Sequence, residues 1–242
     1  MQTDLIGKRI ELLDKGWIEL VDLMPHPSAE VSGDLAIVNA ARVSFLGESK
    51  GTERDKKLLF YLLRNEHTSP FEMVEFKFRL RAPVVTYWQL VRHRTLSINM
   101  QSGRYTPFEE NDFYVPTVWR KQSTDNKQAS EGELPRNESD SLSQQLITHY
   151  EQGFALYTQA LEQGVSKEMA RLFLPGFSVY YTGVIKVDAH NLMRFLRLRI
   201  ASDAQYEIRV YAQAIYDHFF TPALPWTAEA FREYLLKDQN GQ

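Results

Sequence analysis

The sequence predicts an α/β fold of the α+β kind, in which one central antiparallel sheet is flanked by helices. Two observations lead to this fold class. Residues 74–81 alternate between apolar and charged side chains, as in a strand with one buried face. After residue 141 the chain repeats apolar side chains at helical spacing. Because 242 residues, 43% of them hydrophobic, can bury one sizeable core, we expect residues 1–242 to form a single domain.

The N-terminal elements can be assigned in chain order. Residues 10–23 mix apolar and charged positions and are expected to form strands. A short helix is predicted over 34–42. Thr52 offers an N-cap, with Asp55 three positions later, which predicts a second helix that ends near Asn65.

The remaining elements follow from the same reasoning. The strand over 73–81 is expected to end at Pro83, and residues 84–94 return to helical spacing. Residues 120–141 contain almost nothing apolar and are expected to form a polar surface loop. Further helices are predicted over 142–161, 166–173, 189–200, 204–219 and 226–236.

Composition excludes several classes of function. The chain has no cysteine, which excludes disulfides, thiolate metal sites and a cysteine nucleophile, and we expect no metal ion. A net charge of −3 argues against nucleic-acid binding as the main task. We find no apolar run near the ~18 residues that a membrane span needs, and residues 1–8 lack the apolar segment of a secretion signal. A cytoplasmic location is therefore expected.

The most informative segment is 92–105, which reads Arg-His-Arg-Thr-Leu-Ser-Ile-Asn-Met-Gln-Ser-Gly-Arg-Tyr. Arginine binds phosphate or carboxylate through paired hydrogen bonds, and a serine–glycine turn can add backbone N–H groups. A charged helix end would account for Arg92 and Arg94 alone. It would not account for Ser102, Gly103 and Arg104 as well, so the segment favours a phosphate or nucleotide site.

Three other positions have an ordinary structural interpretation beside a functional one. His67 follows a predicted helix end, where a histidine commonly caps the last turn. Glu72, at the start of a strand, is equally ordinary. Arg171 sits in an apolar run, where its guanidinium could simply extend to water from a helix end.

A fourth cluster lies around Arg199. At helical spacing Arg199 falls on or beside the apolar face of its helix, while Arg197 points elsewhere. An arginine directed toward a core needs an anion, which could be a ligand group that develops negative charge. An ion pair with Asp203 or Glu207 would serve equally well, and spacing alone leaves both readings open.

Together these clusters resemble the family of flavin-dependent thymidylate synthases, whose signature is Arg-His-Arg, seven residues, then Ser. The resemblance extends from about residue 35 to 220, and its pieces are 40–44, 67–72, 89–105, 171–175 and 195–208. It implies synthesis of dTMP from dUMP, with carbon from 5,10-methylenetetrahydrofolate and reducing equivalents from NADPH through FAD. It also implies a homotetramer with active sites at subunit interfaces.

The resemblance also assigns roles to residues. The residues implied to hold dUMP are Gln89, Arg92, Met100, Gln101, Ser102, Gly103, Arg104, Arg171 and Arg199, with Arg171 reaching the substrate from another subunit. The residues implied to contact FAD are Ser44, Ser69, Glu72, Arg92, His93, Arg94, Thr95, His190 and Arg194. Arg199 against the uracil and His67 near the flavin are the catalytic candidates. The chain has Asp188 and Asp203 where many members have asparagine and histidine.

The implied chemistry agrees with the composition. Methylation at uracil C5 needs electron density there, and a chain without cysteine cannot obtain it by adding a thiolate to C6. A flavin can deliver hydride instead, and Arg199 is the candidate that stabilises charge developing on the base. Ser102 has no evident adjacent base, so we assign it to substrate binding. A non-catalytic nucleotide sensor is the alternative, and a nucleic-acid binder is a weaker one.

Overall fold

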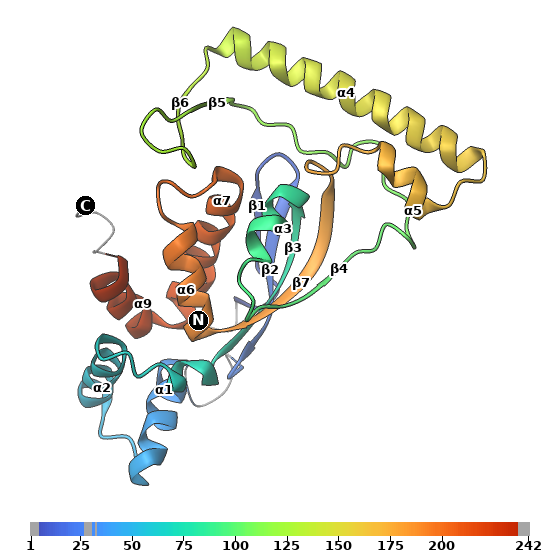
Figure 1. Cartoon of the computed structure of the whole chain (residues 1–242). Coiled ribbons are helices and arrows are strands. Elements are labelled where there is room, and N and C mark those ends of the chain that lie inside the picture. Colours follow the sequence, from blue (N-terminus) through green and yellow to red (C-terminus); the bar gives the residue numbers. More distant parts are fainter. Residues whose placement is uncertain (1–4, 27–30, 32, 237–242) are drawn as a thin grey trace.

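The computed structural model describes residues 5–26, 31 and 33–236 (Figure 1). Its main sheet has five strands in the order β1-β2-β3-β7-β4, and each neighbouring pair is antiparallel. The strands are β1 (Arg9–Leu12), β2 (Gly16–Met24), β3 (Glu75–Pro83), β4 (Ser97–Met100) and β7 (Tyr180–Asp188). The expected α+β fold with a central antiparallel sheet is confirmed. Residues 1–4, part of the segment judged to lack a secretion signal, lie outside the described residues.

The central strand β3 shows why the alternation in the sequence was informative. Its apolar side chains Phe76, Phe78 and Leu80 are buried, whereas Lys77 and Arg79 between them are exposed. The strand pairs with β2 on one side and with β7 on the other. One face of the sheet therefore belongs to the core, and the other carries charge.

Helices cover the apolar face of the sheet. They include α6 (Ala189–Arg199), α7 (Tyr206–Ile215) and α9 (Pro225–Phe231), while α1 (Gly33–Arg42) and α2 (Thr52–Arg64) lie at one end (Figure 1). Their buried side chains form a single hydrophobic cluster with β2, β3 and β7. The helices α8 (Thr221–Ala223), η5 (Tyr216–Phe220) and η6 (Arg232–Leu236) complete this layer, and η5 and η6 are π-helical.

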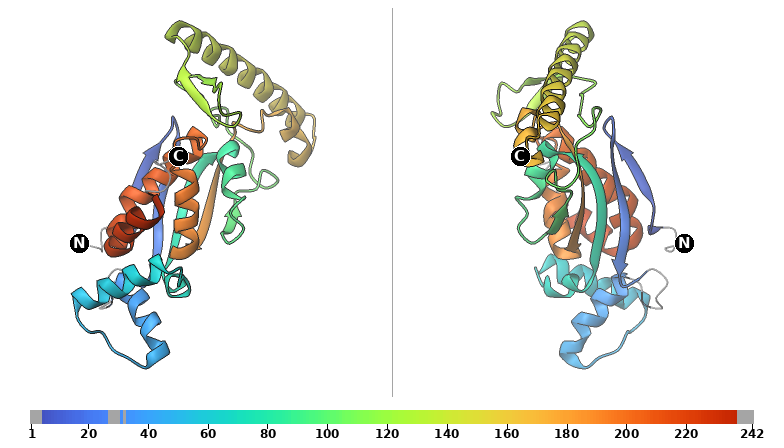
Figure 2. Two further views of the ribbon diagram at one scale, coloured as in Figure 1. Left: turned by 60° about the vertical axis from the view of Figure 1, so that its left-hand side comes forward. Right: turned by 90° about the vertical axis from the view of Figure 1, so that its right-hand side faces the viewer.

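A second, smaller cluster lies beyond the other end of the sheet. The long helix α4 (Arg136–Glu162) crosses this end (Figure 2). It packs Tyr150 and Tyr157 against Phe108 and Phe113, and α5 (Lys167–Ala170) adds Ala170. The 3₁₀ helix η4 (Arg171–Phe173) follows α5, as the expected helix over 166–173 requires.

The start of α2 differs from the prediction. Its N-cap is Gly51, and Thr52 is the first helical residue, without a capping hydrogen bond. Asp55 does not complete a capping box, because its carboxylate accepts hydrogen bonds from the Arg42 guanidinium, the Ser49 hydroxyl and the Lys50 N–H. Tertiary pairing therefore overrides the local signal. The predicted end at Asn65 is confirmed.

The expected loop over 120–141 is wrong. Residues Arg120–Gln122 (β5) and Ser130–Glu133 (β6) form a separate two-stranded sheet, and α4 begins at Arg136. Polar side chains hold this hairpin: the carboxylate of Glu131 accepts hydrogen bonds from the Ser123 hydroxyl and the Thr124 N–H. Such a hairpin shows no apolar alternation, so its strands cannot be predicted from the spacing of hydrophobic residues.

No helix in the described part of the chain combines the length and apolar character that crossing a bilayer requires. The helix expected over 84–94 is shorter than predicted, because α3 (Val84–Leu90) ends before the arginine segment. The other predicted helices are present with shifted ends, and the last two continue as π-helix.

Candidate active site

The arginine segment runs from the end of α3 into a strand. Residues 91–96 form turns, and β4 then pairs with the outer edge of β7. A four-residue strand spans about 13 Å. Arg92 and His93 therefore lie before one end of β4, and Ser102 and Gly103 lie beyond the other. Within one chain, the residues predicted to hold dUMP divide into two groups.

The first group surrounds His93. The Nε–H of Arg199, on α6, donates a hydrogen bond to Nε2 of His93 across 3.1 Å. The His93 ring also stands edge-on to Phe195, with 5.0 Å between the ring centroids. Two segments that are far apart in the sequence, the turn after α3 and the end of α6, thus meet at this histidine.

Electrostatics in this group point to an anionic ligand. Burial lowers the pKa of His93 to about 4, and the positive charges of Arg199 and Arg194 act in the same direction. Burial and the nearby Arg92 also lower the pKa of Arg199. Among the residues that the structure describes, Arg92, Arg194 and Arg199 form no ion pair with a carboxylate. Three cations without a counter-ion make this a place where an anion can bind.

The ion pair considered for Arg199 is not formed. The Glu207 carboxylate accepts hydrogen bonds from Arg120, Gln205 and the Tyr114 hydroxyl instead. Asp203 is exposed. The reading in which Arg199 is directed toward a ligand is therefore the one that the geometry favours.

The second group lies at the far end of β4. The Arg104 N–H approaches the Ser102 hydroxyl at 3.3 Å, and the Tyr105 N–H bonds to the Ser102 carbonyl, which makes a tight turn. A Cβ added to Gly103 would lie 2.5 Å from the Phe108 ring, so only glycine fits beneath that ring. Arg104 pairs with Glu168 of α5 at 2.9 Å, on the surface.

Arg171 belongs to this second group within the same chain. Its Cδ lies 3.7 Å from the position that a Cβ on Gly103 would occupy, and its positive charge lowers the pKa of Tyr181 against the effect of burial. Arg171 lies beside the turn of its own chain because η4, which carries it, packs against α4. That Arg171 reaches dUMP from another subunit stays a prediction. Arg171 is also held by the Glu168 carbonyl, so it does not simply extend to water.

The other residues of the predicted dUMP set contact the sheet or lie on or near α3. The side chain of Met100 packs on the main core, and the Gln101 carbonyl oxygen Oε1 lies 3.4 Å from the Thr182 N–H. Gln89 is half-buried in the last turn of α3. Arg94 and Thr95 are exposed in the turn that follows.

The residues predicted to contact a flavin lie on the 3₁₀ helix η3 (Ser69–Met73), on α6, in the turn after α3 and just after α1. Ser69 and Glu72 are exposed on η3, which packs against α1 and α6. His190 and Arg194 line a cavity of about 410 Å³, together with Thr68, Leu63 and Met193 among others. Ser44 is exposed just after α1, in the 3₁₀ helix η2 (Val43–Phe45).

This cavity, which we call the η3–α6 cavity, has both polar and apolar lining residues, with Glu66 as the acidic one. His190, Arg194 and Arg197 provide cationic or hydrogen-bonding groups for phosphate, while Leu63, Met193 and Leu235 provide an apolar wall for a ring. Its volume lies within the usual range of small-molecule sites. The neighbouring Asp188 has a structural role, because it caps α6 by accepting the Asn191 N–H at 2.9 Å.

His67 has both of the features considered for it. Its backbone N–H donates to the Leu62 carbonyl at 2.8 Å and closes the end of α2, as the backbone of a capping residue does. Its ring is nevertheless exposed and stands edge-on to the ring of Tyr61, with 5.8 Å between centroids. The side chain thus remains available at the surface beside η3.

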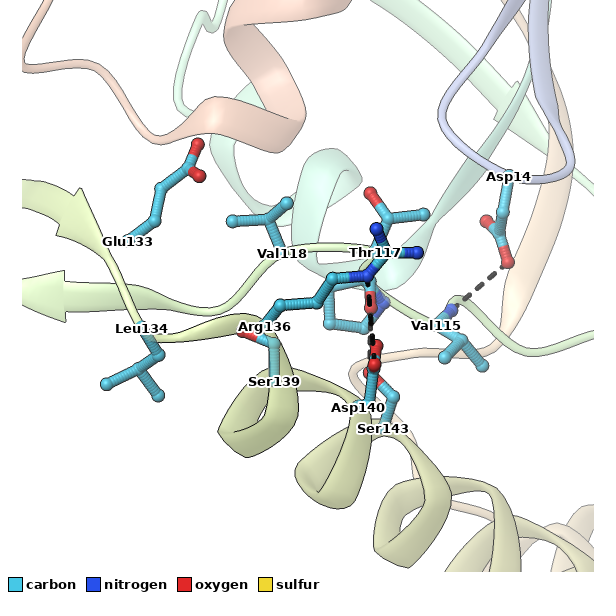
Figure 3. A pocket seen from close by; sticks show the side chains of 11 residues that line it. Asp14, Val115, Thr117, Val118, Glu133, Leu134, Arg136, Ser139, Asp140 and Ser143 are labelled. Carbon is cyan, nitrogen blue, oxygen red and sulfur yellow. Dashed lines mark hydrogen bonds and ion pairs between the residues drawn. The ribbon is translucent and has the colours of Figure 1, made fainter.

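A cavity of about 690 Å³ elsewhere contains none of the predicted site residues (Figure 3). It lies between residues 115–118, the end of β6 and the first turns of α4, and Asp14 borders it. Among the described residues no group of three or more His, Cys, Asp or Glu side chains could hold a metal ion. Sequence reasoning missed Phe108 and Tyr181, which shape the second group but carry no motif.

Comparison with known proteins points in one direction. Residues 20–226 match the family model described as thymidylate synthase complementing protein. A flavin-dependent thymidylate synthase of Thermus thermophilus is 45% identical over 228 residues, which cover 94% of this chain and 80% of that protein. The one from Dictyostelium discoideum is 41% identical over 233 residues, with 94% and 75% covered. The crystal structure of a UMP/dUMP methylase, PolB from Streptomyces cacaoi bound with 5-bromo-UMP, has a TM-score of 0.80 at 32% identity and covers 94% of this chain and 98% of its own.

Proposed function

Because this chain belongs to the family of flavin-dependent thymidylate synthases, we propose that it converts dUMP to dTMP by reductive methylation. The carbon would come from 5,10-methylenetetrahydrofolate, and NADPH would supply reducing equivalents through FAD. Membership of an enzyme family removes the alternative of a non-catalytic nucleotide sensor. A structural neighbour from Streptomyces cacaoi is a UMP/dUMP methylase solved with 5-bromo-dUMP, which supports a pyrimidine monophosphate as substrate.

The observation that carries this proposal is the cluster of Arg92, Arg194 and Arg199 around His93. These guanidinium groups lack carboxylate partners among the described residues, as an anionic ligand would require. We assign Gln89, Arg92 and Arg199 to one half of the dUMP site. The other half would consist of Met100, Gln101, Ser102, Gly103, Arg104 and Arg171, with the phosphate at the serine–glycine turn.

We propose different roles in the reaction for the different residues. A flavin, when bound, supplies the hydride that the methyl transfer requires. The η3–α6 cavity, which His190 and Arg194 line, would hold part of that cofactor. The other residues proposed to contact it are Ser44, Ser69, Glu72, Arg92, His93, Arg94 and Thr95. Arg199 would stabilise negative charge that develops on the uracil. His67, exposed beside η3, would lie near the flavin ring.

Neutral His93 has a positioning role in this proposal. With its pKa near 4, the imidazole is uncharged at neutral pH and its Nε2 can accept the Arg199 Nε–H. The remaining N–H groups of the Arg199 guanidinium then stay free to point at a ligand. A charged His93 would instead repel Arg199.

A homotetramer would join the two halves of the site. The surface beside them is apolar: Trp88 of α3 is 60% exposed and touches Phe177, which is 62% exposed, and Leu172 is exposed nearby in sequence. Exposed apolar patches of this kind are typical of subunit interfaces. The same surface carries α3 and η4, which hold Gln89 and Arg171. Pairing of copies here would bring one chain's first group toward its partner's second group.

The test is anaerobic. Reduced, FAD-loaded enzyme is mixed with dUMP and methylenetetrahydrofolate, and dTMP is measured by chromatography. We expect dTMP in stoichiometric amount, and its absence would refute the proposed reaction. We retain the single domain over 1–242 and the cytoplasmic location as proposals.

A further inference from the structure

A second depression borders the proposed cofactor cavity. It has a volume of about 430 Å³ and lies between α2 and the C-terminal helices α9 and η6. Helix α9 packs against α2 (Figure 1). Its basic and aromatic lining residues are Lys56, Lys57, Phe60, Tyr61, Arg64 and Tyr234. We call it the α2–η6 pocket.

The charge of this pocket is positive at one side. Lys56 is neutralised by Glu229, with 2.7 Å between Nζ and Oε2. Among the residues that the structure describes, Lys57 and Arg64 have no ion-pair partner, and Glu53 is the one other acid in the lining. Lys57 and Arg64 are seven residues apart and therefore share a helix face. Two free cations on one face favour an anionic ligand.

The aromatic side chains provide a surface for a flat ring. Phe60 and Tyr234 meet edge to face, with 6.0 Å between their centroids, and join α2 to η6. Tyr61 is 48% exposed, between Lys57 and Arg64 on the same face. A ring system with an anionic arm could therefore lie on Tyr61 while the arm reaches Lys57 or Arg64.

The position of the pocket links it to the cofactor. Leu63 and Leu235 line the η3–α6 cavity, and their chain neighbours Arg64 and Tyr234 line the α2–η6 pocket. Tyr61 also contacts the ring of His67, which we place near the flavin. A molecule in the α2–η6 pocket would thus be adjacent to the cofactor.

We propose that the α2–η6 pocket binds the anionic arm of an aromatic co-substrate. This inference rests on the proposed function. The shared chemistry is a heteroaromatic ring that carries carboxylates or phosphates. Two co-substrates of the proposed reaction have it: methylenetetrahydrofolate, through its glutamate carboxylates, and NADPH, through its phosphates. Lys57 and Arg64 would bind the negative groups, and Tyr61 would pack against the ring.

The experiment compares the double variant K57A/R64A with R54A, which removes an exposed arginine of the same helix that does not line the pocket. KM is measured separately for dUMP, NADPH and methylenetetrahydrofolate, each at low and at high salt. We expect K57A/R64A to raise KM about tenfold for one co-substrate at low salt. The KM for dUMP and the FAD content should stay unchanged. The difference from wild type should shrink at high salt, because exposed charge pairs are screened.

The outcomes are distinguishable. A rise confined to NADPH assigns the pocket to phosphate, and a rise confined to methylenetetrahydrofolate assigns it to carboxylates. If both values stay within twofold of wild type while the variant keeps its FAD, the inference is overturned. Titration of FAD-loaded protein with NADP⁺ and with tetrahydrofolate, followed by calorimetry, tests the pocket without turnover. If the protein binds a co-substrate in this titration but forms no dTMP, the proposed function fails while the pocket assignment stands. The two failures are therefore distinguishable.

Discussion

The Arg199 Nε–H donates to Nε2 of His93 across 3.1 Å, and this contact joins the turn after α3 to the end of α6. It fixes the imidazole as a neutral acceptor, with its proton on Nδ1. Arg199 therefore bonds to a histidine and not to Glu207, whose carboxylate accepts a hydrogen bond from Arg120. The position of one guanidinium thus depends on the protonation state of one histidine.

Replacement of Arg199 by alanine should strongly lower turnover while the protein keeps its flavin. A group that stabilises charge in the transition state is worth on the order of 2.7–4 kcal/mol, or about 10²–10³ in kcat. The measurement is the rate of dTMP formation, together with the visible absorbance of bound flavin. The matched control is R54A, which should retain wild-type activity. Equal activity of R199A and R54A would remove Arg199 from the catalytic role.

Replacement of His93 by glutamine should flatten the pH dependence of stability. In the folded protein the pKa of His93 is lowered to about 4 from 6.5, first by burial and then by Arg199 and Arg194. As the pH falls below 6.5, the unfolded chain takes up a proton that the folded chain does not. The free energy of unfolding therefore decreases between pH 6.5 and 4. Glutamine can still accept the Arg199 hydrogen bond but does not titrate.

The measurement is urea unfolding of wild type and H93Q at several pH values. We expect the wild-type free energy of unfolding to fall more steeply than that of H93Q between pH 6.5 and 4, and the two slopes to agree above pH 7. Because other carboxylates titrate in both proteins, only the difference between the curves reports on His93. Parallel curves throughout would show that the pKa of His93 is not lowered.

Elements with periodic burial could be predicted from the sequence. Strand β3 and the long helix α4 each bury one regular face, so their apolar spacing is visible. Strand β4 could not be found in this way, because it is an edge strand with three exposed residues of four. Strand β7 was overlooked although its sequence carried a signal: Ile185 and Val187 are buried and Lys186 between them is exposed.

The candidate site could be predicted as a set of residues but not as an arrangement. Arginines, serine and glycine in one segment predict an anion site by their chemistry. Arg92 and Ser102 lie in different groups because β4, which separates them, pairs with β7. This pairing could not be predicted from a buried face, because three of the four residues of β4 are exposed. The proximity of Arg171 to Gly103 likewise depends on the packing of η4 against α4. Tertiary contacts of this kind leave no mark in local sequence.

Replacement of Gly103 by alanine should weaken dUMP binding. The added Cβ would lie 2.5 and 2.7 Å from two carbons of the Phe108 ring, which is buried and cannot easily move. The serine–glycine turn must therefore shift, at a cost of about 1–3 kcal/mol. We expect the Kd for dUMP to rise about tenfold, as measured by calorimetry on the FAD-loaded enzyme.

Two further variants test the cause of this effect. G176A adds the same methyl group where nothing lies within 4 Å, and it should bind dUMP as wild type does. The double variant G103A/F108L removes part of the obstructing ring and should recover a part of the lost affinity. If G103A alone binds dUMP normally, the turn does not hold the substrate as proposed.

Replacement of Arg120 by methionine should release the β5–β6 hairpin from α7. Burial raises the pKa of Glu207, but hydrogen bonds from Arg120 and Gln205 outweigh this effect and hold the pKa below its usual value. Without Arg120 the buried carboxylate loses its counter-ion, and we expect the free energy of unfolding to fall by about 1.5–3 kcal/mol. The exposed neighbour Lys121 gives the control K121M. In the double variant R120M/E207Q a neutral amide replaces the unpaired charge, so urea unfolding should show partial recovery. An R120M protein as stable as K121M would mean that the pair contributes nothing measurable to holding the hairpin on α7.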